Sequence, residues 1–327
     1  MTFGAKMKPD GGAVQAANRR AGWLRFAAKL LVSAALLVWV VSQAGIGAVL
    51  LRFGQTDGSW AAFALLLLVI QYAIMVLRWD LVLRRAFGLH LPLRQLCLVF
   101  GLGELMGTYL PRFVGLNAIR ALPLAKVAPI ATVLRAVLVD RTFGLAALLL
   151  LIAMSLPLRG AAPQFTTAAV TLGLVSIGGL LGLAAVISRP ERWRALPILG
   201  RRIGPVARDL RGTVTDLPIA GAVLATGLAK HLLSVLLIWA IGRMLGAELG
   251  LLSCLMIVPA ALLVSALPIS VGGWGLREAA IVTGFSLIGV DAEAAATASI
   301  AFGLSVLVVS AVGVALPWLP ERGRRRD

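Results

Sequence analysis

Ten ionisable side chains lie in or near stretches of the sequence that are apolar enough to enter a membrane. They are Arg112, Arg120, Lys126, Arg135, Arg141, Lys230 and Arg277, opposed only by Glu104, Asp140 and Glu278. Each charge costs at least a few kcal/mol at the centre of a bilayer, so such residues normally pair with one another, face a cavity or mark a substrate path. The surplus of positive charge predicts a site for an anionic ligand, most economically a lipid phosphate.

Two of these arginines occur in a repeated sequence element. The segment 110–120, LPRFVGLNAIR, aligns with 267–277, LPISVGGWGLR, at an offset of 157 residues. The matched positions include proline, glycine and arginine, which apolar composition alone does not supply. We therefore predict that the two halves of the chain are copies, each arranged as span, span, broken hairpin, span.

The repeated element has the chemistry of an anion site. Proline breaks a helix, and the segment after it starts a second helix whose N-terminal amides and positive dipole end attract an anion. Glycine lets a headgroup approach the backbone, and the arginine of each copy can donate two hydrogen bonds to phosphate oxygens. The predicted substrate-binding residues are Arg112, Gly115, Asn117, Arg120, Lys230, Gly272, Gly273, Trp274, Arg277 and Glu278. An open alternative is that the two arginines pair with Glu104 and Glu278 or extend to a membrane interface.

Other charged residues predict structure more than binding. Asp140 and Arg141 are neighbours on a helix and point about 100° apart, so each needs a partner on another segment. We predict structural ion pairs for Asp140, Arg141 and Glu104. Arg135 and Lys126 lie near the end of a span and are predicted to extend their charged ends to the interface.

The composition excludes several classes of protein. Of the 327 residues, 60% are hydrophobic and 14% are charged, which is too little charge for a water-soluble domain. The formal net charge of +17 is expected in the loops of a membrane protein rather than on a face that binds nucleic acid. Two cysteines and two histidines without metal-ligand spacing, and the lack of GxGxxG and GxxxxGK[ST] motifs, predict no metal and no cofactor.

Several stretches are long and apolar enough to position these residues inside a bilayer. The six predicted spans are 24–44, 60–78, 129–156, 165–187, 218–243 and 293–317. Two further apolar regions, 92–127 and 249–290, are interrupted at Pro111 and Pro268 and predict re-entrant hairpins. The predicted fold is an all-α polytopic membrane protein, with six transmembrane helices and two re-entrant helical hairpins in two inverted-topology repeats.

The predicted organisation follows from these stretches. It comprises a basic leader (1–23), repeat 1 (24–156), repeat 2 (165–317, with a basic loop at 188–217) and a basic tail (318–327). Three crossings in each repeat is an odd number, so the second copy must be upside down relative to the first, as in many secondary transporters. Cleavage after Ser42-Gln43-Ala44 as a signal peptide is an alternative, but it would remove the first span and destroy this symmetry.

The charge bias orients the spans, because cytoplasmic loops collect Lys and Arg. Basic residues concentrate in the leader, after the second span, in the loop 188–217 and in the tail. Those assigned to the loop after the second span are Arg78, Arg84, Arg85 and Arg94. Both termini are therefore predicted to be cytoplasmic. Counting the hairpins as full crossings would place the loop 188–217 on the opposite side, against the bias.

The second hairpin, which reads Gly275-Leu-Arg277-Glu278-Ala-Ala at its turn into the second arm, resembles the Gly-x-Arg-Glu signature of the lysylphosphatidylglycerol synthetase transmembrane (flippase-like) family. The first hairpin, followed by Asp140-Arg141, resembles the other signature of that family. The resemblance covers about 92–317 and implies a lipid-translocating membrane domain, whose neighbours act on aminoacylated phospholipids, hopanoids or polyprenyl-linked glycans.

Two departures from the family pattern bear on function. Asn117 stands where the family often has an acid, which weakens the case for a cationic headgroup. The soluble aminoacyl-transferase domain of the bifunctional members is not found after 317, so an aminoacyl-lipid synthase activity is not expected.

We expect a flippase or transporter of the bacterial inner (cytoplasmic) membrane that moves an anionic, phosphate-bearing lipid or lipid-linked intermediate through a cationic cavity at the midplane. The alternative is a non-catalytic scaffold subunit for a lipid- or glycan-modifying enzyme. The chain is not expected to be an enzyme itself; a lipid transferase with Glu278, Asp140 or Glu104 as base is the least supported alternative. The expected partners are anionic membrane lipids and no nucleic acid.

Overall fold

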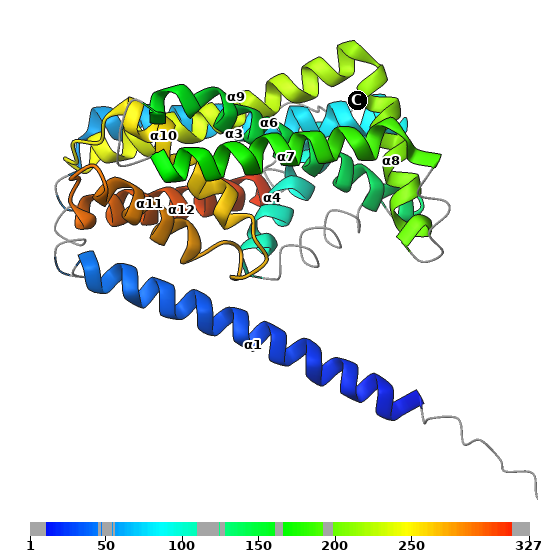
Figure 1. Ribbon diagram of the computed structural model, residues 1–327, viewed down its shortest axis with the longest axis horizontal. Coiled ribbons are helices and arrows are strands. Elements are labelled where there is room, and N and C mark those ends of the chain that lie inside the picture. The colour runs from blue at the N-terminus through cyan, green and yellow to red at the C-terminus, as the bar shows by residue number, and fades with distance from the viewer. Residues whose placement is uncertain are drawn as a thin grey trace, which may run out of the picture.

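The computed structural model describes residues 11–44, 47, 54, 56–109, 124, 128–160, 166–191 and 199–315. This part of the chain is helical and contains no strand (Figure 1). Its helices are α1 (Gly11–Ala44), α3 (Gly58–Leu81), η1 (Val82–Ala86), α4 (Leu93–Tyr109), α6 (Ile130–Gly160), α7 (Thr166–Ser188), α8 (Leu199–Thr215), α9 (Leu217–Met244), α10 (Leu251–Ser265), α11 (Leu276–Ser286) and α12 (Ala292–Ala315).

Five helices are long and apolar enough to cross a membrane, which makes this a multi-pass membrane protein. They cover Gly58–Ala86, Ile130–Leu158, Thr166–Ser188, Leu217–Met244 and Ala292–Ala315, in agreement with five of the six predicted spans. The remaining predicted span, 24–44, lies within α1, where Ala27–Ser42 forms a shorter apolar helix. α1 already begins at Gly11, inside the predicted leader, where alanine is frequent and favours helix.

The loop predicted at 188–217 contains a helix, α8. Its buried residues Gly204, Ala207, Leu210 and Thr213 recur every three positions, which is the spacing of one face of a helix. Composition alone marked this segment as basic, and the periodicity within it was the signal for a helix.

The α3 helix begins at a well-defined cap. The Asp57 carboxylate accepts hydrogen bonds from the Ser59 hydroxyl at 2.6 Å and from the amides of Ser59 at 2.8 Å and Trp60 at 3.3 Å. These bonds lower the pKa of Asp57, with the Ser59 hydroxyl contributing most. The Asp57 amide in turn donates to the Met244 carbonyl at 2.9 Å, so the start of α3 is held at the end of α9.

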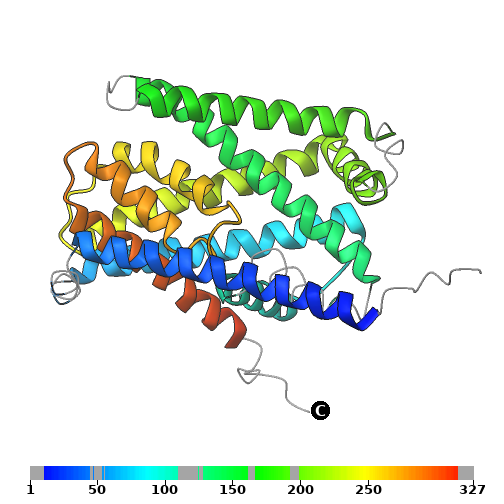
Figure 2. The same ribbon diagram turned by 60° about the horizontal axis from the view of Figure 1, so that its bottom comes forward.

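The helices pack as a bundle around α3 and α9, which lie against one another. On either side of this pair, α4 packs on α12 and α6 packs on α10 (Figure 2). The largest apolar core joins α9, α10, α11 and α12, and a second core joins α3, α4 and the start of α6. A glycine permits the close approach of α4 and α12, since a Cβ on Gly101 of α4 would lie 2.7 Å from the Ser310 carbonyl of α12.

The chain breaks between α10 and α11, in the segment that contains Pro268. α10 ends at Ser265 and α11 starts at Leu276, and the two helices pack against each other. Gly272, Gly273 and Gly275 adopt φ angles of +61°, +83° and +83° in this turn, a region that favours glycine. The corresponding region of the first half, with Pro111, lies outside the described residues.

Arg78 corrects the predicted loop assignment. It was counted among the charges of a cytoplasmic loop, but it lies in α3 with only 4% of its surface exposed. The helix continues through η1 to Ala86, so the loop begins later than the apolar pattern indicated. The Asp140 carboxylate of α6 pairs with the arginine there.

Candidate functional site

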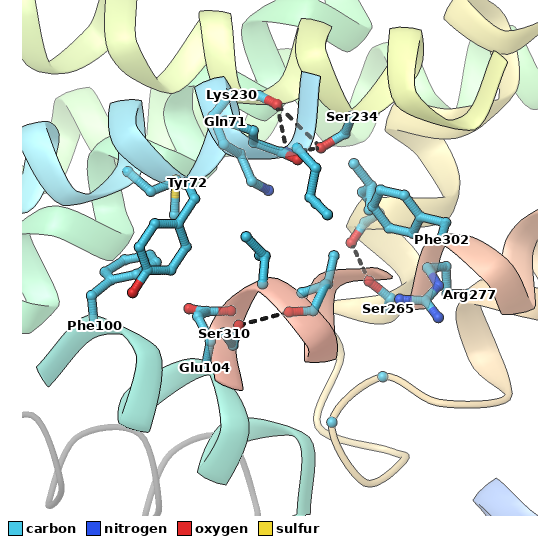
Figure 3. Close-up of a pocket in the computed structure, with 17 residues that line it drawn as sticks. Gln71, Tyr72, Phe100, Glu104, Lys230, Ser234, Ser265, Arg277, Phe302 and Ser310 are labelled. Carbon is cyan, nitrogen blue, oxygen red and sulfur yellow. Dashed lines mark hydrogen bonds between the residues drawn. The ribbon is translucent and has the colours of Figure 1, made fainter. Parts of the chain in front are cut away.

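Two adjoining cavities lie between the helices of the bundle. The first, which we call the arginine cavity, has a volume of about 120 Å³ and lies between α3, α4, α9, α12 and the α10–α11 turn. Its polar lining consists of Gln71, Tyr72, Glu104, Lys230, Ser234, Ser265, Arg277 and Ser310. Figure 3 shows these side chains around one central space, with Arg277 and Glu104 entering from different helices.

Arg277 is held between two aromatic rings. Its guanidinium carbon lies 5.2 Å from the centroid of the Trp274 ring and 5.2 Å from that of Phe302, within the range of cation–π attraction. A Cβ on Gly303 would collide with the guanidinium, so the glycine leaves the space that the arginine occupies. The ring of Trp274, a predicted substrate-binding residue, lies against the Arg277 guanidinium.

Glu278 is fully buried and serves two neighbours. Its Oε2 accepts a hydrogen bond from the Gly275 amide at 2.7 Å and caps the start of α11, while its Oε1 forms an ion pair with Arg277. Arg277 therefore has a counter-charge in the protein, which agrees with the pairing with Glu278 that the sequence left open. The cap explains the pair, because it fixes the carboxylate beside the first turn of the helix.

Arg277 nevertheless retains unused hydrogen-bonding capacity. A guanidinium has five N–H donors, and the Arg277 Nε is buried without a hydrogen-bond partner. The side chain is 14% exposed and lines the arginine cavity.

The turn before Arg277 is fixed by contacts with α10 and α1. A Cβ on Gly273 would lie 2.8 Å from the Ser265 carbonyl, and one on Gly275 would lie 2.6 Å from the Leu36 Cβ. The Val271 amide donates a hydrogen bond of 2.8 Å to the Ser33 hydroxyl of α1. Gly272 and Gly273, two of the predicted substrate-binding residues, line the arginine cavity.

The second cavity, which we call the ion-pair cavity, has a volume of about 300 Å³. The Arg78 Nε lies 2.8 Å from the Asp140 Oδ1, and both side chains are at most 5% exposed. Gly144 and Gly227 border this pair, and Cβ atoms there would lie 3.2 Å and 3.4 Å from the Arg78 Nη1. The predicted ion pair of Asp140 is confirmed, and its partner comes from α3. Arg141 and Glu104 line the same cavity.

Lys230 and His231 lie where the two cavities meet. The His231 Nε2 lies 3.1 Å from the Gly144 carbonyl, so this nitrogen must carry the proton that is donated. The Nδ1 lone pair is then available to the Lys230 Nζ at 3.5 Å. His231 therefore lies against both the Gly144 carbonyl and the Lys230 ammonium group.

The two cavities share Met75, Glu104, Lys230, Leu262 and Ser265 in their linings. Together they form a polar region that extends from Arg277 to the Arg78–Asp140 pair. Among the described residues, no cluster of three His, Cys, Asp or Glu side chains could hold a metal ion.

Part of the predicted site lies in a segment outside the described residues. Arg112, Gly115, Asn117 and Arg120 lie outside the described residues, as does Lys126. The Arg135 Nη1 lies 3.3 Å from the Asp209 carboxylate of α8.

The sequence prediction missed Gln71, Arg78 and Ser234. Gln71 and Arg78 are seven residues apart, and Lys230 and Ser234 are four apart, so each pair shares a helix face. The Gln71 amide joins these faces by donating to the Ser234 hydroxyl at 2.6 Å and the Lys230 carbonyl at 3.1 Å. The signal available in the sequence was the spacing of these polar residues, which places them on one face of each otherwise apolar helix.

Comparison with known proteins supports the resemblance found in the sequence. The chain matches the family described as Lysylphosphatidylglycerol synthase TM region over residues 26–313. No curated protein matches the chain. The matched region contains both cavities, all five candidate spans except the last two residues of α12, and the α10–α11 turn. The chain therefore belongs to the lysylphosphatidylglycerol synthase transmembrane-region family.

Proposed function

We propose that this protein translocates an anionic, phosphate-bearing lipid or lipid-linked intermediate across the membrane, and that the two cavities bind its headgroup. The observation that carries this proposal is the charge of the linings. Four cationic side chains line the cavities, against two acidic ones, among helices that are apolar enough to span a bilayer. The cations are Arg78, Arg141, Lys230 and Arg277, and the acids are Glu104 and Asp140.

The headgroup phosphate would accept hydrogen bonds from Lys230 and Arg277, which line the arginine cavity from α9 and α11. The hydrocarbon chains would stay in the bilayer, because transfer of apolar chains from the bilayer into a polar cavity gains no hydrophobic free energy. We assign no bond-making or bond-breaking step to the chain, and membrane lipids are its proposed partners.

An inverted repeat would give both membrane faces a similar site. The sequence offset of 157 residues maps α3 with η1 onto 215–243, where α9 lies, and maps the start of α4 onto Gly250, the N-cap of α10. The helix contacts follow the same mapping. α3 packs on its counterpart α9. The offset also maps α4 onto α10 and α6 onto α12, so the contact of α4 with α12 corresponds to the contact of α10 with α6. These observations support two copies of one unit, with re-entrant hairpins at 92–127 and 249–290.

The proposed location is the bacterial cytoplasmic membrane with both termini in the cytoplasm. The exposed arginines Arg208 and Arg211 of α8 lie at the end of the bundle where α9 begins. Basic residues favour the cytoplasmic side.

Lys230→Met tests this function. The chain is reconstituted into liposomes with a trace of acyl-labelled fluorescent phosphatidylglycerol, and dithionite reports the fraction of label in the outer leaflet over time. We expect wild type to move the label faster than protein-free liposomes and Lys230→Met to slow it about tenfold or more, because a charge-assisted hydrogen bond to phosphate is lost. Lys230→Arg should retain most of the rate.

Arg243→Gln provides the matched control, since Arg243 is an exposed arginine at the far end of the same helix. It should translocate lipid at the wild-type rate. A Lys230→Met protein that is as fast as wild type, or a wild-type protein no faster than empty liposomes, would contradict the proposal.

The Arg277–Glu278 pair favours a second candidate, a membrane scaffold for a lipid- or glycan-modifying enzyme. A guanidinium that its neighbour already neutralises can serve packing alone. In that case, wild-type liposomes would show no translocation above the protein-free rate.

A further inference from the structure

We infer that α8 lies on the membrane surface and binds anionic phospholipid headgroups through its exposed arginines. In Figure 1, α8 runs across one end of the bundle, whereas α3 and α9 run along its length, and the turned view of Figure 2 agrees. A helix that crosses the ends of membrane-spanning helices lies roughly parallel to the bilayer. Its depth is then that of the headgroups.

One face of α8 is attached to the bundle. Leu210 is 3% exposed and packs in an apolar cluster with Val82, Val139, Phe143 and Val223, which come from η1, α6 and α9. This cluster covers the ends of several helices at once. The opposite face of α8 is therefore fixed in direction and cannot rotate inward.

The outward face is basic. Arg208 and Arg211 are exposed and lie one helical turn apart. The Arg211 Nη1 donates a hydrogen bond of 3.0 Å to the Ser188 carbonyl at the end of α7, which fixes this part of the face. The adjoining η1 adds the exposed Arg85.

Two acidic groups near this face have cationic partners within the protein, and Asp216, which follows α8, caps the start of α9 by accepting from the Ile219 amide. Asp209, the one acid of α8, lies 3.3 Å from Arg135, and Asp80 lies 2.7 Å from Arg84. The exposed surface of α8 and η1 thus carries an excess of positive charge that complements anionic headgroups.

Apolar side chains beside the arginines favour a lipid surface over a soluble acidic protein. Val214 is 36% exposed and Leu217 is 77% exposed, where α8 meets α9. Interfacial helices insert such residues among the acyl chains while their arginines contact phosphates. A soluble protein partner would have to cover them at the membrane surface itself.

Hydrogen exchange of the full chain in nanodiscs tests this inference. The readout is the exchange rate of amides in 199–215, in discs of phosphatidylcholine alone and with phosphatidylglycerol added; 251–265 is the internal reference. We expect phosphatidylglycerol to slow exchange about fivefold or more at low salt, and high salt to weaken the effect. Arg85→Gln/Arg208→Gln should lose the slowing, while Arg243→Gln at the other end of α9 should keep it.

Three results would overturn the inference. The first is equal exchange in the two lipid compositions, and the second is undiminished slowing in the Arg85→Gln/Arg208→Gln variant with an unchanged unfolding temperature. The third is slowing by soluble polyglutamate in neutral discs without any effect of phosphatidylglycerol, which would assign this face to an acidic protein.

Discussion

At the scale of single residues, the buried charges of this protein are positioned by pairing and by glycines. Buried Arg78 meets buried Asp140, and Arg277 meets buried Glu278. Gly144 and Gly303 leave room for the guanidinium groups of Arg78 and Arg277. A charge deep among apolar helices is tolerated when a counter-charge and space are provided together.

The Arg78–Asp140 pair gives the prediction at this scale. Arg78→Met leaves the Asp140 carboxylate buried without its partner, and we expect it to lower the free energy of unfolding by about 3–5 kcal/mol. Arg78→Met/Asp140→Leu should recover most of that loss, because the unpaired charge is removed as well. The measurement is reversible unfolding in mixed detergent micelles.

Arg84→Gln is the control for this pair. Arg84 lies 2.7 Å from Asp80 but is 46% exposed, so its loss should cost less than about 1 kcal/mol. If Arg78→Met costs no more than this control, the buried pair does not stabilise the fold.

At the scale of elements, the α10–α11 turn is held by α1. Gly275 has a φ of +83° and would meet Leu36 with any added Cβ, whereas Gly289 has a φ of +78° and open space around it. α1 also accepts the Val271 hydrogen bond through Ser33. The conformation of the turn that carries Arg277 thus depends on a helix far away in the sequence.

Gly275→Ala and Gly289→Ala separate the cost of a left-handed backbone from the cost of a clash with α1. Gly289→Ala should lower the free energy of unfolding by about 1–2 kcal/mol, the cost of a left-handed backbone for alanine. Gly275→Ala should cost clearly more, because it adds a clash with α1. Equal losses in reversible unfolding would mean that α1 does not press on the turn.

At the scale of the whole molecule, the bundle has two distinct ends. Asp57 at the start of α3 bonds to Met244 at the end of α9, while α8 packs near the start of α9. If α3 and α9 span the membrane, Gly58 and Gly212 lie on opposite sides of it. The predicted topology places Gly212 in the cytoplasm.

Cysteine labelling measures this topology. Gly58→Cys and Gly212→Cys are made in a chain with Cys97 and Cys254 replaced by alanine, since neither glycine has an atom within 4 Å of an added Cβ. An impermeant maleimide should label Gly58→Cys in intact spheroplasts and Gly212→Cys only after permeabilisation. Labelling of both sites in intact spheroplasts is the pattern expected if the hairpins cross the membrane fully, and the reverse pattern would contradict both topologies.

The sequence by itself determined the all-helical class, five of the spans and the helix break around Pro268, because apolar length and proline or glycine punctuation are local properties of the chain. It also marked Lys230, Gly272, Gly273 and Arg277, which do line the arginine cavity. Only the tertiary structure decided which charges meet. Arg78 finds Asp140 because α3 and α6 lie together in the bundle, and helix packing is set by side chains far apart in the sequence. For the same reason, the two joined cavities and the fixed outward face of α8 exist only once the helices are assembled.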